Sequence, residues 1–358
     1  EGMANGAAWA YVSGFVLFFV FRAMIALMAN TYLDLVAECT TEETRGKVLA
    51  AAWTGQTAII VVWALVFRWL MPTYSLEGMQ RLYSLTPAIV FVLGVASIWN
   101  LEKRLTPAEV KASRHQSFSP SSADAAPLKA SLTLLHQPAA RTFFFFVLLS
   151  FPSIFLQDSL QEVFGGEVLG MTLGETTIFQ QIFNGAVTIG MGLTAAFGAR
   201  ALGASMATPD LPADGKKRLI LIGGSGAVLS LLLQSVAALT ASGWIFNLAL
   251  GLFGFTVGIL TFAAVTMMSD MTVEGETGRY LGLWSLAQAV GLGLSFLVGG
   301  LLHTLFIGSG LFAPAVGYAL IFGLEAVCMA FCVRQSQGSS VTDLKAQAVR
   351  SEIRLGEV

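Results

Sequence analysis

Nine long stretches with almost no charged residues constrain this chain of 358 residues more than any other feature. A helix needs about 20 apolar residues to cross the roughly 30 Å hydrocarbon core of a bilayer, and the stretches are of about that length. They run over residues 7–30, 48–71, 83–100, 142–160, 173–199, 219–240, 244–268, 280–303 and 311–333. The sequence therefore predicts an all-α integral membrane protein with nine membrane-spanning helices in this chain.

Composition and motifs exclude several classes of function. Only 12% of the residues are charged, against about 25% in an average soluble domain. The net charge is −2, so the chain has no basic field with which to bind a nucleic acid. The sequence lacks the phosphate-binding motif G-x-x-x-x-G-K-[ST] and the motifs G-x-S-x-G and H-E-x-x-H of hydrolases. We expect no nucleic-acid or nucleotide partner, no enzymatic activity and no metal site.

The distribution of Lys and Arg indicates an orientation in the membrane. Most of these residues lie in the connections 101–141 and 200–218 and in the C-terminal tail, whereas 158–175, 241–243 and 304–310 contain none. Cytoplasmic loops of membrane proteins carry an excess of Lys and Arg. We therefore expect the 101–141 linker and the C-terminus to lie in the cytoplasm.

Two similar segments indicate an internal repeat. LVAECTTEETRGKVLAAAWTGQ follows the first stretch, and TMMSDMTVEGETGRYLGLWSLAQ comes at the end of the seventh. Glu38 and Arg45 in the first copy correspond to Asp270 and Arg279 in the second, and the two acidic residues are 232 positions apart. We interpret the two segments that contain these four residues as equivalent turns, one in each half of the protein, that take part in a conformational change. The repeat makes the first stretch equivalent to the fourth helix of a six-helix half.

This arrangement resembles the major facilitator superfamily, in which two six-helix halves flank a long cytoplasmic loop. The resemblance implies a major-facilitator-like bundle in which the N-terminal three of twelve helices are absent from this chain, so we expect the natural protein to be longer. It also implies four regions: the remainder of an N-terminal helical half at 1–100, a cytoplasmic linker at 101–141, a C-terminal six-helix half at 142–334 and a cytoplasmic tail at 335–358.

The string LQDSLQEVFGGEVLGMTLGETT at 156–177 carries a more specific resemblance. It is similar to the signature of the bacteriochlorophyll-delivery, or PucC-like, family, and LVAECTTEETRGKV is similar to that family's loop after its fourth helix. The resemblance implies an assembly factor for photosynthetic light-harvesting or photosystem complexes. Such a protein would handle or deliver chlorophyll or bacteriochlorophyll, contact antenna or photosystem subunits and lipid, and lie in a thylakoid or intracytoplasmic membrane.

The residues alone leave a second function open, namely an ion-coupled secondary transporter of a small solute. Its coupling groups would be Asp158, Glu162, Arg22 or Glu325. Hydropathy does not separate this function from pigment handling. The string at 156–177 favours pigment handling because it is more specific than the general facilitator pattern.

Four carboxylates on a cation-free segment form the most informative chemical group. They are Asp158, Glu162, Glu167 and Glu175. Asp158 and Glu162 share one face if the helix continues past residue 160. Three interpretations are open: the group is solvated at the exit side, it lines a cavity that binds a magnesium tetrapyrrole or a cationic end of a partner, or it couples protons.

A polar stripe follows in the stretch 173–199. Thr177, Gln180 or Gln181, Asn184 and Thr188 recur at helical spacing. Amides are costly in hydrocarbon unless they are hydrogen-bonded, so we expect this face to point into the bundle. This polar face either makes hydrogen bonds between helices or lines a cavity.

Three isolated ionisable residues complete the candidate set. Arg22 lies deep in a stretch, and its partner is either an acid on a facing helix or a carboxylate of a ligand. His303 ends the eighth stretch and is either hydrated or a ligand of magnesium. Glu325 lies alone in the last stretch and is either a cavity residue or a protonated or paired structural acid.

Overall fold

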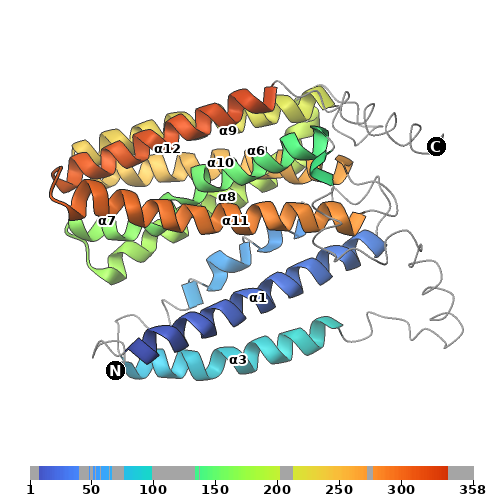
Figure 1. Cartoon of the computed structure of the whole chain (residues 1–358), viewed down its shortest axis with the longest axis horizontal. Helices are drawn as coiled ribbons and strands as arrows, with labels where there is room; N and C mark the ends of the chain where they lie inside the picture. The colour runs from blue at the N-terminus through green and yellow to red at the C-terminus, as the bar shows by residue number, and fades with distance from the viewer. Residues whose placement is uncertain are drawn as a thin grey trace, which may run out of the picture.

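The computed structural model describes residues 8–39, most of 48–66, and residues 76–98, 134–136, 138–201, 213–271 and 277–337. Every regular element in these ranges is helical, which confirms the all-α prediction (Figure 1). The elements are α1 Ala8–Cys39, α3 Leu76–Ile98, η2 Leu134–His136, α6 Pro138–Phe155, η3 Gln157–Ser159, α7 Gln161–Glu167, α8 Leu173–Ala201, α9 Ala213–Leu239, α10 Gly243–Met271, α11 Thr277–His303, η4 Thr304–Gly308 and α12 Pro314–Gln337.

Helices α6 to α12 form one bundle of long, roughly parallel or antiparallel helices. Helix α10 packs against α8 and α9, α12 packs against α9 and α6, and α11 packs against α6. Aromatic side chains fill the centre, where Phe164, Phe246 and Phe322 have mutual ring-centroid distances of 4.5–5.9 Å. Burial of these rings holds α7, α10 and α12 together.

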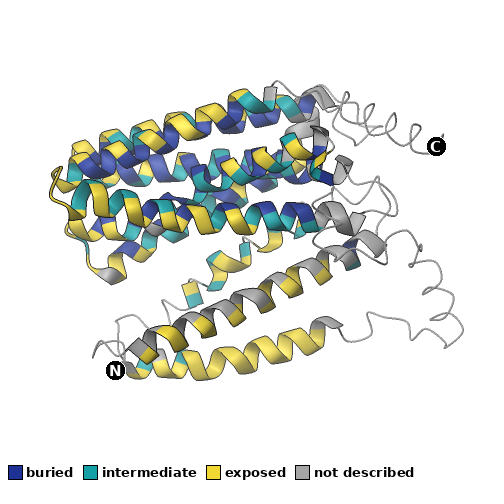
Figure 2. Cartoon of the chain, viewed as in Figure 1, coloured by how far each residue is buried: buried dark blue, intermediate teal, exposed yellow. Residues whose placement is uncertain are grey.

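The outer surface of the bundle is apolar, as expected for contact with lipid. Figure 2 shows buried residues on the inward faces of the helices and exposed residues on the outward faces. The outward residues include large apolar side chains, such as Leu229, Val327 and Phe331, which are 68%, 65% and 59% exposed. Helices α1 and α3 expose most of their described side chains, and α1 contacts α11.

Within the described ranges, four helices are long and apolar enough to cross a membrane. They cover Lys217–Leu239, Gly243–Met267, Gly282–Gly308 and Pro314–Ser336. The remaining predicted stretches are also helical over their described residues, apart from the turn residues 156 and 160 in the fourth stretch. The number of nine spans stays a prediction.

The fourth predicted stretch, 142–160, differs from the prediction because it is not one continuous helix. Helix α6 contains Pro152 and ends at Phe155. A single 3-10 turn follows, closed by a hydrogen bond from Leu160 N–H to the Gln157 carbonyl, and α7 begins at Gln161. Asp158 and Glu162 therefore do not lie on one face of a single helix. We refer to residues 156–160 as the α6 interruption.

Close helix contacts depend on glycine at defined positions. A Cβ on Gly254 would lie 2.5 Å from the Phe183 carbonyl oxygen, and one on Gly223 would lie 2.8 Å from Leu260 N. The run at 223–226 therefore packs helices, as its apolar surroundings indicate. In α11, a Cβ on Gly291 would lie 2.7 Å from the Phe151 Cβ, whereas a Cβ on Gly293 meets nothing within 4 Å.

Candidate functional site

The three connections without Lys or Arg lie together at one end of the bundle, the end marked by α7 in Figure 1. Leu169, in the turn between α7 and α8, lies 3.7 Å from the Cβ position of Gly243 at the start of α10. Ile307, within the third connection, packs against Gly317 of α12. The charge pattern therefore predicts correctly that these connections share one end, which we call the cation-free end.

The α6 interruption brings a buried acid of α12 against the backbone of η3. The Gln157 backbone N–H donates to Glu325 Oε1 at 3.2 Å, and Glu325 is only 2% exposed. The other carboxylate oxygen, Glu325 Oε2, has no hydrogen-bond partner. The side-chain oxygens of Gln157 and Gln161 are also unpartnered, and both residues are 1% exposed. Glu325 is thus buried and accepts one hydrogen bond, and both interpretations of this residue, a cavity residue or a structural acid, stay predictions.

Asp158 links the interruption to the polar stripe of α8. Its Oδ1 accepts a short hydrogen bond from Gln180 Nε2 and a longer one, 3.4 Å, from Gln161 Nε2. Asn184 Nδ2 donates to Gln180 Oε1 at 3.0 Å, which extends the chain of hydrogen bonds along α8. Gln180 and Asn184 are thus half-buried and hydrogen-bonded, Thr177 is exposed, and Gln180 rather than Gln181 makes the contact with η3. The direction of the whole stripe stays a prediction.

Glu162, at the start of α7, is half-buried beside this network. Burial raises the pKa of its carboxyl group, and the charge of Asp158 raises that pKa further. No Lys or Arg of the described ranges forms an ion pair here, so no basic side chain offsets the repulsion between the two carboxylates when both are ionised.

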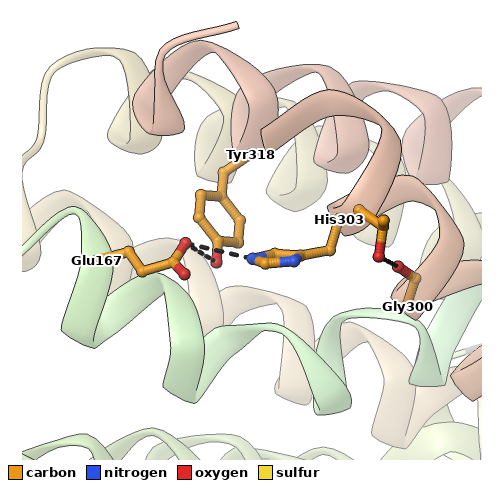
Figure 3. Close-up of polar contacts among 5 residues, drawn as sticks. Glu167, Gly300, His303 and Tyr318 are labelled. Carbon is orange, nitrogen blue, oxygen red and sulfur yellow. Dashed lines mark hydrogen bonds and ion pairs between the residues drawn. The ribbon is translucent and has the colours of Figure 1, made fainter. Parts of the chain in front are cut away.

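Glu167, His303 and Tyr318 form a second cluster at the cation-free end (Figure 3). Glu167 Oε2 accepts a hydrogen bond from the Tyr318 hydroxyl at 2.8 Å and lies 3.3 Å from His303 Nε2. His303 therefore directs its Nε2 at a carboxylate, and magnesium ligation through this atom stays a prediction that requires the contact to open. The role of Tyr318 was not apparent in the sequence, because its partner lies 151 residues away.

Glu175 lies apart from the other three carboxylates and caps helix α8. Its Oε2 accepts hydrogen bonds from both the backbone N–H and the hydroxyl of Thr172, each 2.8 Å long. These bonds lower the pKa of the Glu175 carboxyl. The sequence TLGE is a capping box of the form T-x-x-E, a local signal that predicts this role.

Five predicted site residues lie wholly or partly outside the described part of the protein. Arg22 and Glu38 fall on α1, Asp270 falls on α10 and Arg279 falls on α11, but their side chains are not described. Arg45 lies entirely outside the described residues. The described residues include no group of three His, Cys, Asp or Glu capable of holding a metal ion.

Comparison with known proteins gives a match to one protein family. Residues 2–334 match the family model described as PUCC protein. The chain is 28% identical over 344 residues to "Bacteriochlorophyll synthase 44.5 kDa chain" of Rhodobacter capsulatus, covering 93% of this chain and 73% of that protein. It is 28% identical over 368 residues to "Uncharacterized protein in puhA-bchM intergenic region" of the same species, covering 98% and 72%. It is 23% identical over 332 residues to "Protein PucC" of Cereibacter sphaeroides, covering 91% and 68%.

Proposed function

Because this chain belongs to the PUCC protein family, we propose that it is an assembly factor for photosynthetic light-harvesting or photosystem complexes. The observation that carries the proposal is the family match across nearly the whole chain. The long apolar helices indicate a multi-pass membrane protein, which places the site of action in a membrane. The resemblance of residues 156–177 to the family signature, noted in the sequence, supports the same function.

The proposed cargo is chlorophyll or bacteriochlorophyll, delivered to antenna or photosystem subunits in a thylakoid or intracytoplasmic membrane. One relative is named for bacteriochlorophyll, and this name supports the choice of pigment class. The charge pattern supports an orientation with the 101–141 linker and the C-terminus in the cytoplasm.

The proposed architecture has nine spans arranged as in the major facilitator superfamily. The helical repeat around Glu38 and Asp270 supports two related halves. Helices α1 and α8, of 32 and 29 residues, are long enough to cross a bilayer in addition to the four apolar helices.

The described residues fit a chlorin macrocycle only in part. The outer face of the bundle offers apolar surface for a flat ring and a hydrocarbon tail. The ring's central magnesium needs one further ligand, and His303, the candidate for it, faces Glu167 instead. We therefore assign no axial ligand and derive no step through the pigment.

We propose that the chain assists assembly and does not synthesise pigment, although one relative is named as a chain of a synthase. A deletion strain separates the two functions. Loss of an assembly factor leaves the complete pigment present while antenna or photosystem complexes fall several-fold. Accumulation of a pigment precursor, with the finished pigment lost, would show that the protein acts in synthesis.

The transporter alternative has weaker support. None of the three relatives described above is named as a transporter. The buried polar residues at the α6 interruption would suit a transporter, but they do not by themselves identify a solute. Proton-coupled uptake by vesicles that is lost in Glu162→Gln or Arg22→Ala, with complex levels unchanged, would favour transport.

A further inference from the structure

The α6 interruption is the place where polar groups meet deep inside the apolar bundle. Broken helices in membrane proteins expose backbone groups that bind ions or substrates. Here the backbone N–H of Gln157 is turned to the side chain of Glu325 on α12. The interruption is also tied to α8 through Asp158 and Gln180. Two further helices, α12 and α8, therefore meet at the interruption.

The interruption has more hydrogen-bond acceptors than donors. Gln157 Oε1, Gln161 Oε1 and Glu325 Oε2 are all acceptors, all are buried, and none has a hydrogen-bond partner. Buried polar atoms are nearly always hydrogen-bonded in native proteins. Three unpartnered acceptor oxygens in one hydrogen-bonded neighbourhood indicate that a group carrying donors, or a positive charge, belongs there.

The surrounding helices supply no cation to this neighbourhood. The sequence has no Lys or Arg at 142–199, 219–278 or 280–333. In the described residues, the titratable group that interacts with Glu325 is Cys328 on α12; Cys332 lies one helical turn beyond Cys328, and Asp158 follows Gln157 in η3. Helix α9, which packs on α12, has its basic residues, Lys216, Lys217 and Arg218, in its first two turns. An ionised Glu325 would therefore be an uncompensated charge in a medium of low dielectric constant.

We propose that the α6 interruption binds a single small positive charge, held by Glu325 together with the side-chain oxygens of Gln157 and Gln161. The occupant is a proton or a monovalent metal cation such as Na⁺. A proton converts Glu325 Oε2 to a hydroxyl that donates a hydrogen bond to an amide oxygen. A Na⁺ ion takes the same three oxygens as ligands. The inference goes beyond the proposed function and holds whether or not the protein handles pigment.

Two measurements on the purified full chain in detergent distinguish the occupants. The first is an infrared pH titration of the C=O stretch of protonated carboxyl groups, in the wild type and in Glu325→Gln. The second is the apparent Tm in NaCl against choline chloride at equal ionic strength. Gln keeps the acceptor for the Gln157 N–H, so the substituted helix retains its contact with η3.

A bound proton predicts a carboxyl band that persists at neutral pH in the wild type and is missing in Glu325→Gln, with no specific effect of Na⁺ on the Tm. A bound Na⁺ predicts no such band, and a Tm that rises with NaCl in the wild type but not in Glu325→Gln. Glu162→Gln, which replaces a carboxylate beside the site, leaves either signature intact. A Glu325 that titrates as an ordinary carboxyl, together with a Tm indifferent to Na⁺, would overturn the proposal.

A second variant keeps the test decisive if Glu325→Gln does not fold. Gln157→Leu removes one acceptor oxygen but retains the backbone N–H that contacts Glu325. It shifts the frequency of the Glu325 carboxyl band if the occupant is a proton. It weakens the apparent affinity for Na⁺ about tenfold, the effect of one lost ligand contact, if the occupant is Na⁺. Absence of both effects contradicts the proposal.

Discussion

At the scale of single residues, Glu167 connects three separate elements. It ends α7, and its carboxylate meets Tyr318 of α12 and His303 of α11 (Figure 3). The sequence identified Glu167 and His303 as candidates because polar residues are conspicuous in an apolar chain. It did not predict their pairing, since the two residues are 136 positions apart and meet only in the folded bundle.

We expect Tyr318→Phe to destabilise the bundle. The substitution removes the hydroxyl that donates to Glu167 while the buried ring keeps its packing. A hydrogen bond to a partly exposed carboxylate contributes about 1 kcal/mol, so the apparent Tm should fall by a few degrees. Tyr83→Phe, at a position 73% exposed, is the matched control and should leave the Tm unchanged. Equal Tm values for Tyr318→Phe and the wild type would contradict the assigned contact.

Glu162 and Glu175 should have opposite effects on stability as the pH changes. The lowered pKa of Glu175 means that its ionised form stabilises α8 above the ordinary value of 4.5, and this contribution is lost as the pH falls through the lowered pKa. The raised pKa of Glu162 means that ionisation destabilises the fold at neutral pH, and this cost disappears as the pH falls through the raised pKa to below 4.5.

At neutral pH, therefore, Glu162→Gln should raise the apparent Tm, and Glu175→Gln should lower it. On acidification the effect of Glu162→Gln should vanish first, because its pKa is the higher of the two. Both effects are small, since Glu162 is partly exposed and Glu175 is fully so. Thermal unfolding at several pH values measures them. Two variants that shift the Tm in the same direction at neutral pH would be incompatible with these assignments.

At the scale of elements, the helices were predictable and the interruption of α6 was not. Apolar length predicts a helix, and the predicted stretches are helical over most of their described residues; the exceptions include residues 156 and 160 and residues 311–313. The residues 156–160 are as compatible with a continuous helix as with a break, and Pro152 lies within α6 rather than at its end. The break is stabilised by contacts with α12 and α8, which no local pattern contains.

Helices α8 and α10 are in close contact at Gly258, and we call this contact the α8–α10 seam. The seam should tolerate no added side chain at Gly258. A Cβ there would clash with the Val187 carbonyl oxygen and lie 2.9 Å from Met191 N, so the two helices would have to separate. We expect Gly258→Ala to destabilise by about 1–3 kcal/mol despite the higher helix propensity of Ala. The control, Gly293→Ala, adds a methyl group where nothing lies within 4 Å and should be neutral or slightly stabilising. A Gly258→Ala protein as stable as the control would show that the seam is looser than described.

At the scale of the whole molecule, charge and hydropathy predicted the class of protein and the common end of three connections. The low charge predicts a membrane protein, and the Lys and Arg distribution groups the connections that the structure brings together. The number of spans, the orientation and the pigment stay predictions. Hydropathy indicates which surface is apolar. The same apolar surface is suited to contact with lipid, with a pigment or with a partner helix, so hydropathy does not distinguish these three contacts.

The most direct test of the central claim is the pigment content of the protein itself. The full protein is purified in mild detergent from a photosynthetic host, its absorption spectrum is recorded, and the extracted pigment is quantified against protein. We predict a long-wavelength chlorin band at a near-integer ratio of pigment to protein, which persists after antenna or photosystem subunits are removed. Pigment no more abundant than on an unrelated membrane protein purified in parallel would contradict the claim that this protein handles chlorophyll or bacteriochlorophyll.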